Sequence, residues 1–166
     1  MASKSPSESY TVLERLVLPS DINGFGTLYG GKLMEWIDNI AAIVAAKHSR
    51  RINVTGSIDG LFFLSPIRLG DIVRMTARVN YVTNSTMEIE VDVASQESLS
   101  GIRKFTTKAF LTYVAVDKDG KPTEVPQLKL KTSEEKARFK EGRKRSALRV
   151  DRLHQIKAEM ARQDKK

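Results

Sequence analysis

Cysteine is absent from this sequence of 166 residues, which excludes disulfide frameworks, thiolate metal sites and cysteine nucleophiles. The only two histidines, His48 and His154, are 106 residues apart, so we expect neither a histidine metal site nor a catalytic triad. No run of about 18 apolar residues is present, so no transmembrane span is predicted. The polar start, residues 1–9, lacks the apolar segment of a signal peptide. We therefore expect a cytoplasmic protein without a metal.

Positive charge is the strongest bias of the composition, and it is unevenly distributed. The net charge is +8, but residues 1–125 contain 14 Lys and Arg against 14 Asp and Glu, whereas residues 126–166 contain 14 against 6. A body without net charge argues against a specific nucleic-acid partner, for which a basic face is expected. The apolar share of 40% is enough for a hydrophobic core, so we expect a folded domain followed by a basic segment.

One long helix and several strands are predicted between residues 11 and 116. Leu33, Ile37, Ile40 and Val44 recur at helical spacing among alanines, which predicts a helix over residues 31–48. One helix cannot supply the crossovers of a parallel sheet or cover both of its faces. We therefore expect an α+β fold in which an antiparallel sheet of five or more strands wraps the helix, and its outer face favours an oligomer. Apolar alternation or β-branched residues predict strands at residues 11–18, 53–64, 71–83, 87–93 and 105–116.

The composition changes sharply after Pro126, where charged residues predominate. Residues 132–135 (Thr-Ser-Glu-Glu) have the spacing of a helix capping box, and a charged helix is predicted from there to about Arg162. Its apolar residues form a poor stripe, so we expect it on the surface. The resulting division is a flexible N-terminus at residues 1–12, a domain at 13–128 and a basic helical extension at 129–166.

Asp38 is the most informative candidate for catalysis. It lies two turns into the predicted helix, and no Lys or Arg stands three or four residues away to pair with it. Asp is a poor residue for a helix interior, and on an apolar face it must be desolvated. Such a carboxylate is a candidate general base or nucleophile. The alternative interpretation places Asp38 at a solvent-exposed edge beside Glu35.

Two further groups could bind the polar parts of a substrate. Gly30 and Gly31 precede the helix, where unpaired N–H groups at the positive end of the helix dipole can hold an oxyanion. Asn23 lies in the turn before them, and the alternative is that these residues only form and cap that turn. The second group, residues 83–86 with residues 100–104, combines hydroxyls with paired cations that could hold a phosphate. Its alternative is a solvated turn and a charged strand edge.

Several motifs, in order and at the expected spacing, resemble hotdog-fold acyl-CoA thioesterases. Within this family the chain is similar to the cytosolic acyl-CoA hydrolases, which include bacterial short-chain enzymes and the animal brain-type enzyme. The resemblance spans residues 13–145. It is carried by LPSDINGFGTLYGGKLMEWID (18–38), FLSPIRLGD (63–71), NSTMEIEV (84–91), KAFLTYV (108–114), VPQL (125–128) and SEEKARFKEGRKR (133–145).

The resemblance implies a hotdog fold that forms dimers by joining sheets edge to edge, and commonly a trimer of dimers. It places the active site at the dimer interface, with Asp38 from one subunit and Asn23 from the other. Asp38 would activate water or act as a nucleophile, and Asn23 would orient the water or the carbonyl. The N–H groups of Gly30 and Gly31 would hold the oxyanion.

The same resemblance implies hydrolysis of fatty acyl-CoA to free fatty acid and CoA. No cofactor is implied, because coenzyme A is part of the substrate and product. We expect its nucleotide and phosphates to contact four residues, namely Asn84, Ser85, Arg103 and Lys104.

Two alternatives to a hydrolase remain open at this stage. A hotdog dehydratase is one, but it usually needs a histidine with a carboxylate, and His48 stands about 15 Å from Asp38 along the helix. The other is a non-catalytic hotdog module that binds acyl-CoA, or nucleic acid through the basic tail. The absence of interleaved aromatic and basic residues weakens the nucleic-acid version.

Overall fold

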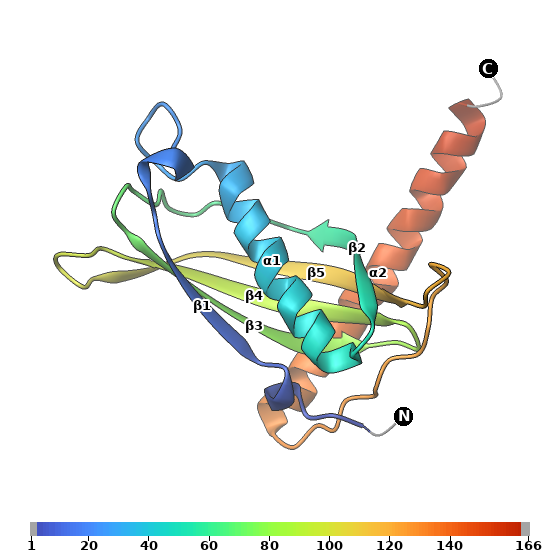
Figure 1. Cartoon of the computed structure of the whole chain (residues 1–166). Helices are drawn as coiled ribbons and strands as arrows, with labels where there is room; N and C mark the ends of the chain where they lie inside the picture. The colour runs from blue at the N-terminus through green and yellow to red at the C-terminus, as the bar shows by residue number, and fades with distance from the viewer. Residues whose placement is uncertain (1–2, 164–166) are drawn as a thin grey trace.

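The computed structural model of the chain describes residues 3–163 and consists of one sheet between two helices (Figure 1). Residues 1–2 and 164–166, which belong to the two terminal segments defined above, lie outside the described residues. In chain order the elements are β1 (Thr11–Leu16), α1 (Gly30–Ser49), β2 (Ile52–Asp59), β3 (Ile72–Val82), β4 (Thr86–Gln96), β5 (Arg103–Val116) and α2 (Ser133–Gln163), with short 3-10 turns at Pro6–Glu8 and Pro19–Asp21.

The sheet is antiparallel throughout, with the strand order β1-β3-β4-β5-β2. Side chains alternate between its faces, so Met87, Ile89, Val91 and Val93 of β4 face α1 and form the core with it. The intervening Glu88, Glu90 and Asp92 lie on the outer face. The expected α+β architecture, a long helix wrapped by a five-stranded antiparallel sheet, is confirmed.

Helix α1 follows its apolar periodicity closely. The side chains of Leu33, Ile37, Ile40 and Val44 are almost fully buried against the sheet. The helix ends at Arg50, which adopts the left-handed conformation (φ 53°) and donates its N–H to the carbonyl of Ala46. The predicted helix is thus confirmed, with one additional residue at each end.

The predicted strands are confirmed as elements, most of them to within two or three residues at each end, but one is much shorter than expected. The strand expected at residues 53–64 ends at Asp59, where Gly60 turns the chain with a positive φ of 58°. The apolar residues after Gly60 form an irregular segment instead. The β-branched and aromatic composition of residues 53–64 as a whole predicted one strand, but Phe63 packs over the start of α1.

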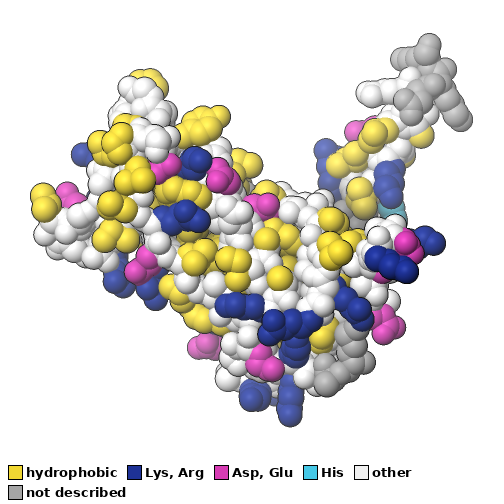
Figure 2. Space-filling view, viewed as in Figure 1, with side chains coloured by type: hydrophobic (Ala, Val, Ile, Leu, Met, Phe, Trp, Pro, Cys, Tyr) yellow, Lys and Arg dark blue, Asp and Glu magenta, His cyan; other side chains and the backbone are white. Residues whose placement is uncertain are grey.

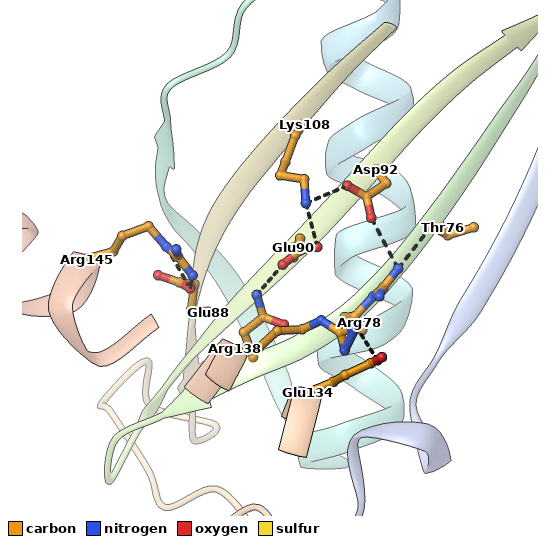
Figure 3. A network of polar contacts seen from close by, with 10 residues as sticks. Thr76, Arg78, Glu88, Glu90, Asp92, Lys108, Glu134, Arg138 and Arg145 are labelled. Carbon is orange, nitrogen blue, oxygen red and sulfur yellow. Dashed lines mark hydrogen bonds and ion pairs between the residues drawn. The ribbon is translucent and has the colours of Figure 1, made fainter. Parts of the chain in front are cut away.

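Helix α2 lies on the opposite face of the sheet from α1, and its first half is tightly docked there. A Cβ on Gly142 would come within 2.7 Å of the Tyr81 Cβ, so only glycine permits this approach. The Glu88 carboxylate, with 1% of its side chain exposed, accepts hydrogen bonds from Arg145 at 2.6 Å (Figure 3) and from Arg149 at 2.9 Å. The expected surface helix is therefore held by buried ion pairs.

The start of α2 and the start of the chain are both anchored. The predicted capping box forms, since Thr132 and Glu135 exchange hydrogen bonds between side chain and backbone N–H at 3.1 Å. In the segment expected to be flexible, Lys4 donates to the carbonyl of His48 at 2.7 Å. Neither helix is both long enough and apolar enough to span a membrane, as judged over residues 3–163.

Candidate functional site

The Asp38 carboxylate is held by two hydroxyl groups from the sheet. Its Oδ1 accepts hydrogen bonds from Tyr113 at 2.6 Å and from Thr55 at 3.0 Å. Tyr113 belongs to β5 and Thr55 to the edge strand β2, and the two residues stand opposite each other in the ladder. Its Oδ2 accepts no hydrogen bond from residues 3–163. The carboxylate is therefore oriented through one oxygen, and the other can receive a proton.

Tyr113 is a buried phenol that serves Asp38 as a donor. Burial raises the pKa of Tyr113, and the hydrogen bond to Asp38 raises it further. The phenol therefore stays protonated at neutral pH, and its proton points to the Asp38 carboxylate, with the Asp38 main-chain carbonyl 2.9 Å away. Glu35, the neighbour considered above, is exposed and pairs with Lys32 at 2.9 Å, so the two carboxylates of α1 differ in environment.

Gly30 and Gly31 form the first turn of α1, beside a cavity. Neither of their N–H groups donates a hydrogen bond within the described chain, as is usual at a helix N-terminus. A cavity of about 320 Å³ lies against Gly30 and is lined mainly by apolar residues, among them Leu33, Phe63 and Ile67. A Cβ on Gly31 would come within 2.6 Å of the Tyr29 ring. Gly30, though not Gly31, therefore lines a partly apolar cavity that could hold an acyl group.

Asn23 lies in the loop before α1 and is fixed within that loop. Its Oδ1 accepts the N–H of Phe25 at 2.9 Å, and its Nδ2 donates to the Thr27 hydroxyl at 3.0 Å. This loop is at the N-terminal end of α1, whereas Asp38 is about 12 Å further along the helix from Gly30. One chain therefore does not bring Asn23 and Asp38 together.

The four expected CoA contacts fall into two separate pairs. Asn84 and Ser85 form the hairpin before β4, whereas Arg103 and Lys104 begin β5 at the other end of β4. The eleven residues of β4 separate the pairs, a span of about 33 Å. Lys104 and Arg68 line a polar cavity of about 230 Å³ that shares Ser65 with the cavity beside Gly30. Within one chain, only the second pair lies near the start of α1.

Sequence reasoning did not find Tyr113, Thr55, Phe63 or Arg68. The contact from Tyr113 to Asp38 joins residues 75 positions apart, and no local pattern encodes a contact of that range. Arg68, Phe63 and Tyr113 had a detectable signal, because each lies within a motif that carried the resemblance, whereas Thr55 lies in none of them.

The chain is similar to known proteins over most of its length. Residues 25–102 match the family described as the thioesterase superfamily. A Bacillus subtilis protein, named an uncharacterized acyl-CoA thioester hydrolase, is 44% identical over 128 residues, covering 77% of this chain and 74% of that protein. The rat cytosolic acyl coenzyme A thioester hydrolase is 40% identical over 84% of this chain, which spans only 37% of the rat protein.

Two solved structures are similar in both fold and sequence. An apo-hexameric acyl-CoA thioesterase has a TM-score of 0.87 and 41% identity, over 92% of this chain and 98% of its own. An acyl-CoA hydrolase from Staphylococcus aureus, in complex with butyryl coenzyme A, coenzyme A and coenzyme A disulfide, has a TM-score of 0.88 and 37% identity, over 95% and 96%. The Staphylococcus aureus protein has also been solved with alanine replacing an aspartate, an asparagine or a threonine.

Proposed function

The chain belongs to the acyl-CoA thioester hydrolases of the thioesterase superfamily, and we propose that it hydrolyses fatty acyl-CoA with a water molecule activated by Asp38. The family resemblance and the hotdog fold predicted from the motifs are confirmed. In this reaction water attacks the thioester carbonyl, and the tetrahedral oxyanion then expels the sulfur as CoA. Coenzyme A enters within the substrate and leaves as product, so the proposed step involves no cofactor.

The observation that carries this proposal is the one-sided hydrogen bonding of the Asp38 carboxylate. Tyr113 and Thr55 hold Oδ1, so Oδ2 can accept a proton from water as that water attacks. The proton can then pass to the leaving CoA sulfur. Direct attack by Asp38 on the thioester carbonyl, which would break the C–S bond, expel CoA and leave an anhydride that water then hydrolyses to the free acid, is the second route.

A property of the Staphylococcus aureus protein supports the assignment. The aspartate, asparagine and threonine replaced in its three alanine variants have the same mutual sequence spacing as Asp38, Asn23 and Thr55 of this chain. We therefore include Thr55 in the proposed site, as a residue that positions Asp38.

A second copy of the chain would complete the site. The edge strand β2 pairs only with β5 within residues 3–163, and Thr55 links this edge to Asp38. Pairing of two copies along β2 would place Asp38 beside the interface, where Asn23 and the Gly30 and Gly31 N–H groups of the other copy can complete the site. We propose a homodimer of this kind, and a trimer of dimers by analogy with the hexameric thioesterase.

Coenzyme A would lie across the polar cavity near the start of α1. Lys104 and Arg68 line this cavity and can pair with phosphates, as can Arg103 beside them. Asn84 and Ser85 are far from it in the same chain, so we propose that they contact the nucleotide from another subunit. A cytoplasmic location also remains a prediction, supported by the name of the rat relative.

Release of CoA from acyl-CoAs of increasing chain length tests the proposed chemistry. A thiol reagent follows it without background, because the chain has no cysteine. We expect Asp38→Asn to lower kcat by about 10²–10⁴-fold, and the matched control Glu35→Gln, on the same helix, to retain activity. Full turnover by Asp38→Asn would remove the general-base assignment. No CoA release by folded wild-type protein would contradict the hydrolase function.

A second variant tests how Asp38 is oriented. Tyr113→Phe removes the donor to Oδ1 and keeps the buried ring, so we expect kcat to fall by about tenfold with little change in KM. Unchanged kcat in a folded Tyr113→Phe protein would show that this hydrogen bond has only a structural role.

A further inference from the structure

Helix α2 crosses the outer face of the sheet in the order of the strands. Phe139 packs on Tyr81 of β3, with ring centroids 4.9 Å apart. Arg145 then reaches Glu88 of β4, and Arg149 reaches Asp59 of β2 at 2.7 Å. The helix has therefore crossed from an inner strand to the edge strand by Arg149, and it continues for 14 more residues to Gln163.

Helix α2 extends past the edge strand β2, and the row of residues that faces the sheet in its first half continues in the part beyond that edge. The C-terminal part of α2 extends beyond the sheet (Figure 1), and residues 154–163 are all exposed. The ten helical steps from Leu153 to Gln163 span about 15 Å, or about three strand spacings. The stripe comprises residues 139, 142, 146 and 149, with alternating spacings of three and four. The same spacing continues beyond the sheet at Leu153, Ile156 and Met160.

This continuation is apolar and exposed. Ile156 is 39% and Met160 58% exposed, and Figure 2 shows apolar side chains gathered on the projecting part of α2. A helical segment gains most of its stability by packing an amphipathic face. The apolar stripe of the projecting residues is therefore suited to packing against a sheet, but within one chain no strand lies beneath it among residues 3–163.

The outer face of the sheet, on which α2 lies, also has a mainly apolar groove. Its volume is about 330 Å³, and it lies between the second half of α2 and the edge of the sheet. Residues of this groove include Gly56, Thr86, Thr112, Val114, Val150 and Leu153.

We propose that residues 154–163 of α2 dock on the outer sheet face of a second copy of this chain, with Ile156 and Met160 in or beside its groove. This inference rests on the pairing along β2 proposed above, because pairing continues the sheet beneath the projecting helix. Two copies paired in this way are related by a two-fold axis, so each α2 reaches over the other copy. The interface becomes reciprocal, and the projecting stripe and the groove are both covered.

The charge of the projecting part favours a protein surface over an anionic membrane. Residues 154–163 contain only two cations, Lys157 and Arg162, and one anion, Glu159. A helix that binds anionic lipid usually carries many Lys and Arg on its polar face.

Dissociation on dilution, followed by light scattering or sedimentation, is the first test. Ile156→Glu with Met160→Glu places charge on the stripe, and we expect the dissociation constant of the dimer to rise by about tenfold or more. Ala158→Glu, on the opposite side of the same helix, is the matched control and should leave that constant unchanged. An unchanged constant in the double variant would contradict the proposal, while CoA release by that variant reports on the hydrolase function separately.

Disulfide mapping provides a second test, since the chain has no native cysteine. One population carries Met160→Cys and the other Val114→Cys, each with a different tag. After mixing and oxidation we expect a disulfide between the two tagged chains, and much less of it when Ala158→Cys replaces Met160→Cys. Equal yields from positions 158 and 160 would overturn the proposal. So would vesicle binding by wild-type protein that the Ile156→Glu with Met160→Glu variant loses while its dimer constant is unchanged.

Discussion

Helices α1 and α2 cover opposite faces of the same sheet by different physical means. The stripe of α1 on the sheet is aliphatic, and four of its residues, at positions 33, 37, 40 and 44, are almost fully buried. Helix α2 is docked by Gly142 and by two arginines that neutralise the buried Glu88 carboxylate. Apolar burial is non-directional, whereas a buried ion pair is stable only when each charge keeps its partners. The two helices should therefore respond differently to mutation.

The largest loss of stability is expected on α1. Ile37 is fully buried, so Ile37→Ala leaves a cavity and should lower the free energy of unfolding by about 2–5 kcal/mol. Ile43→Ala on the same helix is the matched control, because Ile43 is 37% exposed and should cost about 0.5 kcal/mol. Chemical denaturation at one fixed protein concentration measures both. Equal losses would show that Ile43 is also buried, in the assembly.

The same difference explains how much of the fold could be predicted from sequence. Aliphatic periodicity found α1 and the strands, because burial there requires apolar side chains. Aliphatic periodicity did not predict how α2 docks on the sheet. The residues of α2 that contact the sheet include Gly142, Arg145 and Arg149, and none of these is an aliphatic residue. The Arg145 guanidinium even stacks over the Phe110 ring at 3.8 Å, a contact without a local sequence signal.

Of the candidate site, the sequence predicted only the residues that lie on helix α1 and in the loop before it. Asp38 is unusual in a helix interior, and Gly30 and Gly31 stand at a helix start, so local rules draw attention to them. Tyr113 and Thr55 reach Asp38 only because β5 and β2 are paired beside α1. Such contacts depend on tertiary structure, so sequence reasoning without the fold could not find them.

A smaller, local effect is expected on α2. Glu88→Gln leaves Arg145 and Arg149 facing a neutral amide and should cost about 2 kcal/mol, because the helix can lift from the sheet and hydrate its arginines. Hydrogen exchange should accelerate along α2 while amides of β4 and β5 stay protected. The control Glu134→Gln removes only an exposed pair with Arg138, and should change stability by less than about 0.5 kcal/mol. Faster exchange throughout the core would show that α2 and the sheet unfold as one unit.

The smallest effect concerns the one histidine of each helix. His48 ends α1 fully buried, donating from Nε2 to the Pro126 carbonyl at 2.8 Å. Burial lowers the pKa of His48 below its ordinary value of 6.5. The unfolded chain therefore binds a proton more readily than the folded one, so this stabilisation is present above pH 6.5 and is lost as the pH falls toward the lower folded value.

Denaturation curves at several pH values between 7.5 and 5 measure this loss, which we expect to be about 1 kcal/mol. His48→Gln keeps an N–H donor for Pro126 without the titration, so it should flatten the stability profile below pH 6.5. His154→Gln, on the exposed half of α2, should keep the wild-type slope. A second window, in which Glu90 is protonated, should remain in both variants at lower pH. Burial opposes ionisation of Glu90, but hydrogen bonds from Asn80 and Lys108 hold its pKa below 4.5. If His48→Gln kept the wild-type slope of stability between pH 7.5 and 5, the pH dependence in that range would not arise from His48.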